Sequence, residues 1–203
     1  MIIDLATLSG YAAYNAMTQT IVPRPVAWVL SDNGDGGYNL APFSYFNALT
    51  SEPPLITLSI GNKRDGEAKD TLHNIVTRNH LVIHIPHREQ AVAVTHSAAP
   101  LAHGDSEIAQ LGLELTEFPG FSLPRLAECR IAMGCTHYQT LEIGPRPQSL
   151  VVCQIQSLWI DDNIIDSPAD APLHLDARRL DPLGRLGGDE YVTLGEIFTV
   201  TNP

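Results

Sequence analysis

The sequence predicts a mainly β protein, a β-barrel with helices inserted between its strands. Short apolar stretches recur along the 203 residues, and clusters of Gly, Pro, Asn and Asp separate them, which is typical of strands joined by turns. Strands and helices do not alternate regularly, so the pattern does not favour a Rossmann sheet. The glycine-rich dinucleotide motif that would follow a first strand is also missing from the sequence.

The first predicted elements follow from helix and strand propensities and from the positions of two prolines. Residues 8–17 are rich in Ala and predict a helix with Ser9 as its N-cap. Two prolines exclude helix from 20–25, which we expect to be extended. Residues 26–31 are β-branched and aromatic and predict a strand.

The next elements form a predicted hairpin and a second strand. The glycine-rich run 33–37 predicts a turn, so a partner strand should begin at Tyr38. Pro42 must lie at an edge or a bulge, because proline cannot donate a hydrogen bond to a neighbouring strand. Residues 53–61 alternate in polarity and predict a strand.

Helices and strands then alternate briefly. Residues 69–78 carry apolar side chains on one face and predict a helix, and 81–86 predict a strand. Residues 88–97 predict a second amphipathic helix, and 105–111 a short helix that Gly112 ends.

Two long strands, 127–143 and 150–161, are predicted next, with a turn at 144–147 between them. Residues 162–181 are irregular and contain proline, and the tail to 203 has a glycine-rich piece. Because the chain shows neither repeats nor a linker, we expect one domain over 1–203, with a core at about 20–161 and a C-terminal extension at 162–203.

Composition narrows the classes of partner. Hydrophobic content is 44% and net charge is −11, so the chain can build a core but is a poor partner for nucleic acid or an anionic membrane. The N-terminus lacks the basic start of a signal peptide, and no apolar run is long enough to span a membrane. Three cysteines, Cys129, Cys135 and Cys153, cannot all pair with each other, which favours buried thiols in a reducing cytoplasm.

Two polar groups of residues could carry chemistry. Lys69, Asp70 and Thr71 open a predicted helix, where free N–H groups, a hydroxyl and a cation would make an anion site. Asp70 or Thr71 could equally be a plain N-cap, and the spacing alone favours the plain cap. His84 and His87 lie three residues apart, but a metal site needs further ligands, so we interpret them as structural or surface histidines.

The segment 39–47 mixes Asn, Ser and Pro with three aromatic residues. Backbone exposed beside Pro42 could hydrogen-bond the edge of a planar heterocycle, and nearby aromatic rings could lie near its face. Packing in the core is the alternative, and it is what we expect for most of these aromatic side chains.

Four blocks in this order resemble the flavin reductase-like family of FMN-binding split β-barrels: RPVAWV (24–29), NLAPFSYFN (39–47), SEPPLITLSIG (51–61) and KDTLHN (69–74). The tail LGRLGGDEY (183–191) is also similar to the end of some members. The resemblance implies a homodimer that binds FMN non-covalently at or near the subunit interface. It also implies NAD(P)H as co-substrate and, for some members, a partner monooxygenase.

Carried over by position, the resemblance implies that FMN contacts come from these blocks. Ser44 and Asn47 are the best side-chain candidates around the isoalloxazine, and Lys69 and Thr71 around the phosphate. The full set of predicted cofactor-binding residues is Trp28, Asn39, Ala41, Pro42, Ser44, Phe46, Asn47, Ser59, Gly61, Lys69, Thr71 and Asn74.

One region departs from the family pattern. Where many members carry an Asp-Lys-Phe-like piece before the Gly-Leu at 112–113, this chain has Asp105, Ser106 and Glu107. That region often lies near the open face of the flavin, so a different substrate is possible, and His103 is a candidate there. An electron carrier without NAD(P)H activity, a ligand-binding barrel that has lost FMN and a metal-dependent hydrolase remain the alternatives, in that order.

Overall fold

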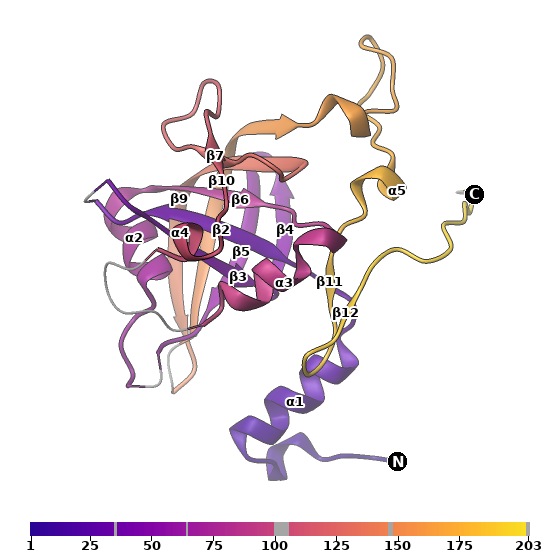
Figure 1. Ribbon diagram of the computed structural model, residues 1–203. Coiled ribbons are helices and arrows are strands. Elements are labelled where there is room, and N and C mark those ends of the chain that lie inside the picture. Colours follow the sequence, from indigo (N-terminus) through magenta and orange to yellow (C-terminus); the bar gives the residue numbers. More distant parts are fainter. Residues whose placement is uncertain (35, 64, 100–105, 146–147, 202–203) are drawn as a thin grey trace.

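In the computed structural model, which describes residues 1–34, 36–63, 65–99, 106–145 and 148–201, seven antiparallel strands form one curved sheet (Figure 1). Its order from edge to edge is β3-β2-β6-β9-β10-β5-β4. The strands are β2 (Ala27–Asp32), β3 (Tyr38–Phe43), β4 (Phe46–Ser51), β5 (Pro54–Ile60), β6 (His80–His84), β9 (Ile131–Ile143) and β10 (Gln148–Ile160).

The order of the strands requires the sheet to curl. β3 and β4 are separated by two residues in the chain, Ser44 and Tyr45, yet they occupy the two opposite edges. The Ser59 N–H of β5 donates to the Tyr45 carbonyl at 2.9 Å, which holds this connection against the far edge. The sheet is therefore a barrel whose two edge strands meet at the β3–β4 connection.

The predicted strands of the seven-stranded sheet are confirmed, with β4 as the one omission in that sheet. The turn at 33–37 joins β2 to β3 as expected, and Pro42 lies in the edge strand β3. β4 was not predicted as a strand of its own, because its residues follow a segment rich in polar and proline residues. All its residues after Phe46 are exposed, so no buried alternation marks it in the sequence.

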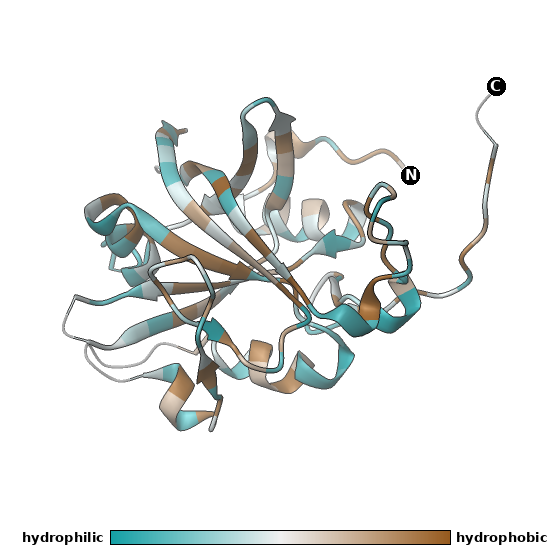
Figure 2. Cartoon of the chain, turned by 90° about the horizontal axis from the view of Figure 1, so that it is seen from above, coloured by the Kyte–Doolittle hydropathy of each residue, from teal (hydrophilic) through white to brown (hydrophobic). Residues whose placement is uncertain are grey.

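Two apolar clusters lie on the two faces of the sheet. Successive side chains of β2 point to opposite faces, so this strand contributes to both clusters. Ala27 and Val29 join an inner cluster with residues of β5, β6, β10 and α2, whereas Trp28 and Leu30 join an outer cluster under α3 and α4. Figure 2 shows hydrophobic stretches running along the central strands. A strand buried on both faces explains why 26–30 is a continuous apolar run.

The helices cover the barrel unevenly. They are α1 (Gly10–Thr20), α2 (Asp70–Arg78), α3 (Ala91–His96), α4 (Glu107–Gln110) and α5 (Ala177–Leu180), with 3₁₀ turns η1 (Leu5–Thr7), η2 (Arg88–Gln90) and η3 (Asp162–Ile164). The Ser9 cap is confirmed, since its hydroxyl accepts from Ala12 N at 3.2 Å. The predicted helix 88–97 starts as η2 and continues as α3, and Gly112 ends the short helix with φ of 63°.

The C-terminal part returns to the start of the chain. β1 (Arg24–Pro25), β11 (Gly184–Arg185) and β12 (Tyr191–Val192) form a small sheet, and β7 (Leu115–Thr116) pairs with β8 (Arg125–Leu126). Leu183 is buried in the outer cluster, so the end of the chain contributes to the core. None of the helices in the described ranges is long and apolar enough to cross a membrane.

Candidate functional site

The N-terminus of α2 is the first part of the candidate site. Lys69 occupies the N-cap position, and its side chain makes no capping hydrogen bond. The prediction that Asp70 or Thr71 is a plain N-cap is wrong, because both residues belong to the first turn of α2. Asp70 instead pairs with Lys63 at 2.9 Å, which offsets its negative charge at the helix start.

A buried polar network connects this helix to the barrel. Asn39 Nδ2 donates to the Thr71 hydroxyl at 2.9 Å, and Asn74 Nδ2 donates to the Ser31 hydroxyl at 3.2 Å. All four side chains are buried. Two sequence blocks that lie about thirty residues apart therefore meet at one end of the barrel, where β3 faces the first turns of α2.

The network continues away from the helix start and fixes the β2–β3 turn. Asn74 Nδ2 also donates to Asn33 Oδ1 at 2.8 Å, and Arg78 donates to the Asn33 carbonyl at 2.5 Å and to Asn74 Oδ1 at 3.3 Å. The amide of Asn74 is thus engaged on both sides. Its position supports the turn, and whether it also contacts a cofactor stays a prediction.

Lys69 faces the end of β3. Its Nζ lies 5.5 Å from the centre of the Phe43 ring, within the range of a cation–π contact. The side chain keeps exposed surface, but the atoms around its ammonium group desolvate it and lower the pKa of Lys69. A partly desolvated cation gains more from an anionic ligand than a fully hydrated one does.

The β3–β4 connection is held by an arginine that the sequence analysis did not single out. The Arg24 side chain is buried and donates to the carbonyls of Thr18 and Ile21 at 2.8 and 2.6 Å, and to the Leu186 carbonyl at 2.8 Å. Its Nε donates to the Ser44 hydroxyl at 3.4 Å. Arg24 thereby joins α1, the C-terminal tail and a predicted flavin contact. Its signals in the sequence were the two prolines beside it and its place at the start of the RPVAWV block.

The end of β5 forms the opposite side of this connection. The Ser59 hydroxyl accepts from Gln148 Nε2 at 3.0 Å. A Cβ placed on Gly61 would lie 3.1 Å from Gln148 Oε1, so the glycine permits close approach of this amide.

The remaining predicted contacts lie in several environments. Trp28 is fully buried under α3 and its indole N–H donates to the Ser97 hydroxyl at 2.9 Å, so its side chain offers no surface to a ligand. Ala41 and Phe46 are half-buried against the inner cluster, Pro42 is half-buried, and Asn47 is exposed. Contact of these residues with a flavin stays a prediction.

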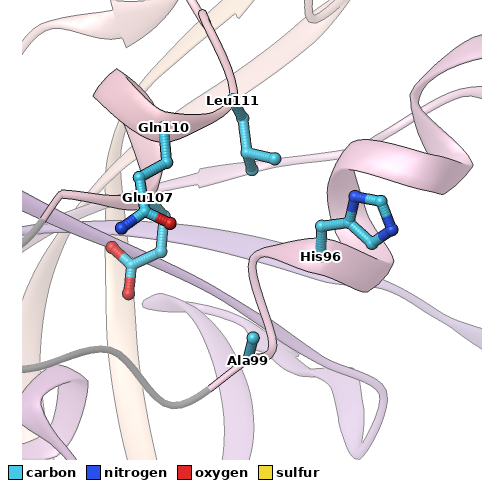
Figure 3. Close-up of a pocket in the computed structure, with 5 residues that line it drawn as sticks. All are labelled: His96, Ala99, Glu107, Gln110 and Leu111. Atoms are coloured by element: carbon cyan, nitrogen blue, oxygen red, sulfur yellow. The ribbon is translucent and has the colours of Figure 1, made fainter.

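A pocket of about 270 Å³ lies between the end of α3 and α4 (Figure 3). Its lining residues are His96, Ala99, Glu107, Gln110 and Leu111. Glu107 Oε2 accepts from the backbone N–H of Leu40 at 3.1 Å, and desolvation raises the pKa of this buried carboxyl. The sequence had marked Glu107 only as a departure from the family pattern, because its position against β3 depends on the tertiary structure.

The histidines of β6 and the following turn do not converge on one point. His84 uses both ring nitrogens, one with the Trp28 carbonyl at 3.0 Å and one with the Leu126 N–H at 2.9 Å. Within the ranges that the structure covers, there is no group of three metal-ligating side chains. His103 lies outside the described residues.

The sequence model of the flavin reductase-like domain matches residues 18–184. The chain belongs to the flavin reductase-like family. It is similar to nitrilotriacetate monooxygenase component B from Bacillus cereus, with 31% identity and a TM-score of 0.90 over 98% of both chains. The 2-nitrobenzoate 2-nitroreductase NbaA of Pseudomonas fluorescens has 28% identity and a TM-score of 0.88, over 100% of this chain and 96% of that one.

The predicted fold is confirmed by the sheet and by a further comparison. A Shewanella frigidimarina chain with a split barrel domain superimposes with a TM-score of 0.85 and 18% identity, over all of both chains. This flavin reductase-like protein is thus a split β-barrel. At 18% identity, the comparison with the Shewanella frigidimarina chain supports the fold alone.

Proposed function

We propose that this flavin reductase-like protein binds FMN and acts as an NAD(P)H-dependent flavin oxidoreductase. The observation that carries the proposal is the 2.9 Å hydrogen bond from Asn39 to Thr71. This bond joins β3, the segment proposed to face the isoalloxazine, to the helix start proposed to hold the phosphate. The family membership of the chain supports the same assignment.

The start of α2 fits a phosphate. The first N–H groups of an α-helix have no partner within the helix, and the helix dipole favours an anion there. Lys69 adds a desolvated positive charge, and Thr71 adds a hydroxyl. The ion pair of Asp70 with Lys63 reduces the repulsion that a carboxylate in the first turn would otherwise exert on a phosphate.

The β3–β4 connection fits the ring system. Ser44 and Ser59 present hydroxyl groups whose protein partners, Arg24 and Gln148, hold them in position. Phe43 ends β3 beside Lys69, so the phosphate and ring regions adjoin. Asn47, on the exposed strand β4, would reach the same ligand from the other edge of the barrel.

When bound, FMN would supply the redox chemistry, with N5 as the site for the hydride from C4 of NAD(P)H and a further acceptor for the two electrons. The protein residues would bind FMN and orient it. Arg24 holds the β3–β4 connection, the Asn39–Thr71 bond fixes β3 against α2, and the buried core beneath them keeps water from one side of the site. No side chain has to transfer a proton in the hydride step.

We further propose a homodimer in a reducing cytoplasm, with a monooxygenase as one possible electron acceptor. Exposed apolar side chains on β4 and on the outer half of β9, such as Leu49, Tyr138 and Leu141, would be covered by a second copy. Three free, buried cysteines are compatible with a reducing compartment. Likeness to a monooxygenase component B favours a partner oxygenase, and likeness to NbaA favours a nitroaromatic acceptor. Sedimentation velocity tests the dimer.

The deciding experiment is an absorbance and fluorescence titration of the purified protein with FMN, followed by anaerobic addition of NADH or NADPH. Saturable FMN binding with bleaching of the flavin bands is the expected result. Saturable binding without bleaching would favour an electron carrier. Absence of any saturable FMN binding would refute the proposed function and leave a ligand-binding barrel as the next candidate.

A further inference from the structure

Arg24 is a buried cation in contact with the β3–β4 connection. We infer that Arg24 is a positioning residue that tunes the redox potential of bound FMN: through the Ser44 hydroxyl it directs a hydrogen bond at the flavin ring and favours the reduced, negatively charged ring over the oxidised one. The inference rests on the proposed function. It goes beyond the anchoring of α1 and the C-terminal tail, because anchoring needs only hydrogen-bond donors and no charge.

The guanidinium group of Arg24 lies among neutral partners. The residue is 6% exposed, and its hydrogen bonds to described residues run to three backbone carbonyls and one hydroxyl. None of the ion pairs formed by the described residues includes Arg24. The residue opposite it in the pairing of β1 with β11 is another cation, Arg185. Because arginine stays protonated in proteins, an unneutralised positive charge persists beside the β3–β4 connection.

The contact with Arg24 determines the direction of the Ser44 hydroxyl. Arginine has only donors, so the hydroxyl oxygen accepts from Nε at 3.4 Å and cannot donate back. Ser44 is half-buried, and its hydroxyl hydrogen has no acceptor within the part of the chain that the structure describes. Ser44 can therefore donate to a ligand, and the ligand atom that it meets is an acceptor.

The charge of Arg24 acts on the residues of the connection. Burial and the neighbouring Tyr14 raise the pKa of Tyr45, and the charge of Arg24 opposes this rise because it favours the phenolate. Tyr45 directly follows Ser44, and its carbonyl accepts from the Ser59 N–H. Negative charge formed at this connection is thus stabilised by Arg24, and more strongly than in water, because the protein interior weakens electrostatic interactions less than water does.

Reduction changes the charge of a flavin ring. The oxidised ring is neutral, whereas the two-electron reduced ring loses a proton near neutral pH and then carries a negative charge on its pyrimidine part. A hydrogen-bond donor and a cation beside this part stabilise the reduced form more than the oxidised form. Charges and hydrogen bonds of this kind are the means by which a protein tunes a cofactor. Arg24 and Ser44 together would therefore raise the redox potential of FMN.

The other polar side chains of the proposed site do not supply this charge. The Ser59 hydroxyl accepts from the Gln148 amide, so its hydrogen is also available to a ligand, but its partner is neutral. Lys69, a second cation, is proposed to pair with the phosphate, which would neutralise its charge. Arg24 remains as the cation for the ring.

The test measures the midpoint potential of bound FMN by titration with dithionite and an indicator dye, which needs no turnover. The wild type is compared with Arg24→Met, Arg24→Lys, Ser44→Ala and the double variant Arg24→Met/Ser44→Ala. Arg130→Met is the matched control for lost anchoring, because Arg130 also donates to two carbonyls of the C-terminal part, those of Arg179 and Leu180.

In Arg24→Met, the affinity for reduced FMN should fall about 10-fold more than the affinity for oxidised FMN, as for one charge-assisted hydrogen bond, which lowers the potential by about 30 mV. Ser44→Ala should lower the potential by a similar amount, and the double variant by no more than either single variant, because both act through one hydrogen bond. Arg24→Lys keeps the charge, so its potential should fall less than that of Arg24→Met. Arg130→Met should keep the wild-type potential.

An unchanged potential in Ser44→Ala, equal shifts in Arg24→Met and Arg130→Met, or additive shifts in the double variant would overturn the inference. Ser44→Ala removes one hydroxyl from a half-buried position, so it tests the inference even if Arg24→Met does not fold. If the wild type binds no FMN, the proposed function fails and the inference falls with it. If FMN binds but NAD(P)H does not bleach it, only the reductase assignment fails, and the dithionite titration still decides the inference.

Discussion

Acid sensitivity of the fold should come largely from His84, which is fully buried between β2 and β8. Its neutral ring is matched to its surroundings, because Nδ1–H donates to the Trp28 carbonyl while Nε2 accepts from the Leu126 N–H. A proton on Nε2 would face another donor. Burial is the main cause that lowers the pKa of His84 to about 4.

The sign and size of the effect of pH on stability follow from the thermodynamic linkage between protonation of His84 and folding. The unfolded chain takes up a proton at this histidine below pH 6.5, whereas the folded chain does so only near pH 4, so the free energy of unfolding falls as the pH is lowered between these values. The stabilisation is complete above pH 6.5. About 2 kcal/mol should be lost by pH 5 and about 3 kcal/mol by pH 4, at 1.36 kcal/mol per pKa unit.

Urea denaturation of the wild type and of His84→Asn at pH 7 and pH 5 measures this contribution. The variant does not titrate at this position, and its amide can still donate to the Trp28 carbonyl. Its loss of stability relative to the wild type should be about 2 kcal/mol smaller at pH 5 than at pH 7. His87 and His137, whose pKa values are also lowered, affect both proteins alike.

The reasoning would be refuted if the stability difference between the two proteins did not change with pH. NMR titration of the wild-type histidine rings provides an independent check that does not depend on the variant folding. The His84 ring signal should stay that of a neutral imidazole at pH 5. A midpoint near 6.5 would show that the site tolerates the proton.

Three further changes test the site and the fold. Lys69→Met should weaken FMN binding by about 1–3 kcal/mol in a fluorescence titration, and unchanged affinity would remove Lys69 from the phosphate site. Gly134→Ala should cost about 1–3 kcal/mol in urea denaturation, because its Cβ would lie 2.7 Å from the Phe121 ring; Gly10→Ala, with open space around it, should not. Arg24→Met leaves three carbonyls without their donor, so limited proteolysis should cut the first twenty residues faster than in the wild type; equal rates would contradict its role as an anchor.

Much of the fold follows from local chemistry. Proline, glycine-rich turns and alternation place most strands, since these signals act over a few residues and need no partner. The helix at 69–78 is marked by one apolar face, and Ser9 by its position before a run of alanine. β4 was missed because it is exposed after Phe46, and exposure removes the pattern that marks a half-buried strand.

The sequence by itself identified the family, because local motifs carry it, and it placed six of the seven strands of the main sheet. The blocks predicted to hold a cofactor are local motifs as well. Only the tertiary structure decided which residues meet. It joined Asn39 to Thr71 and placed Glu107 against Leu40, and it buried Trp28 beneath α3. Contacts between residues far apart in the chain depend on how the sheet curls and how helices pack on it. Local propensity does not encode those long-range distances.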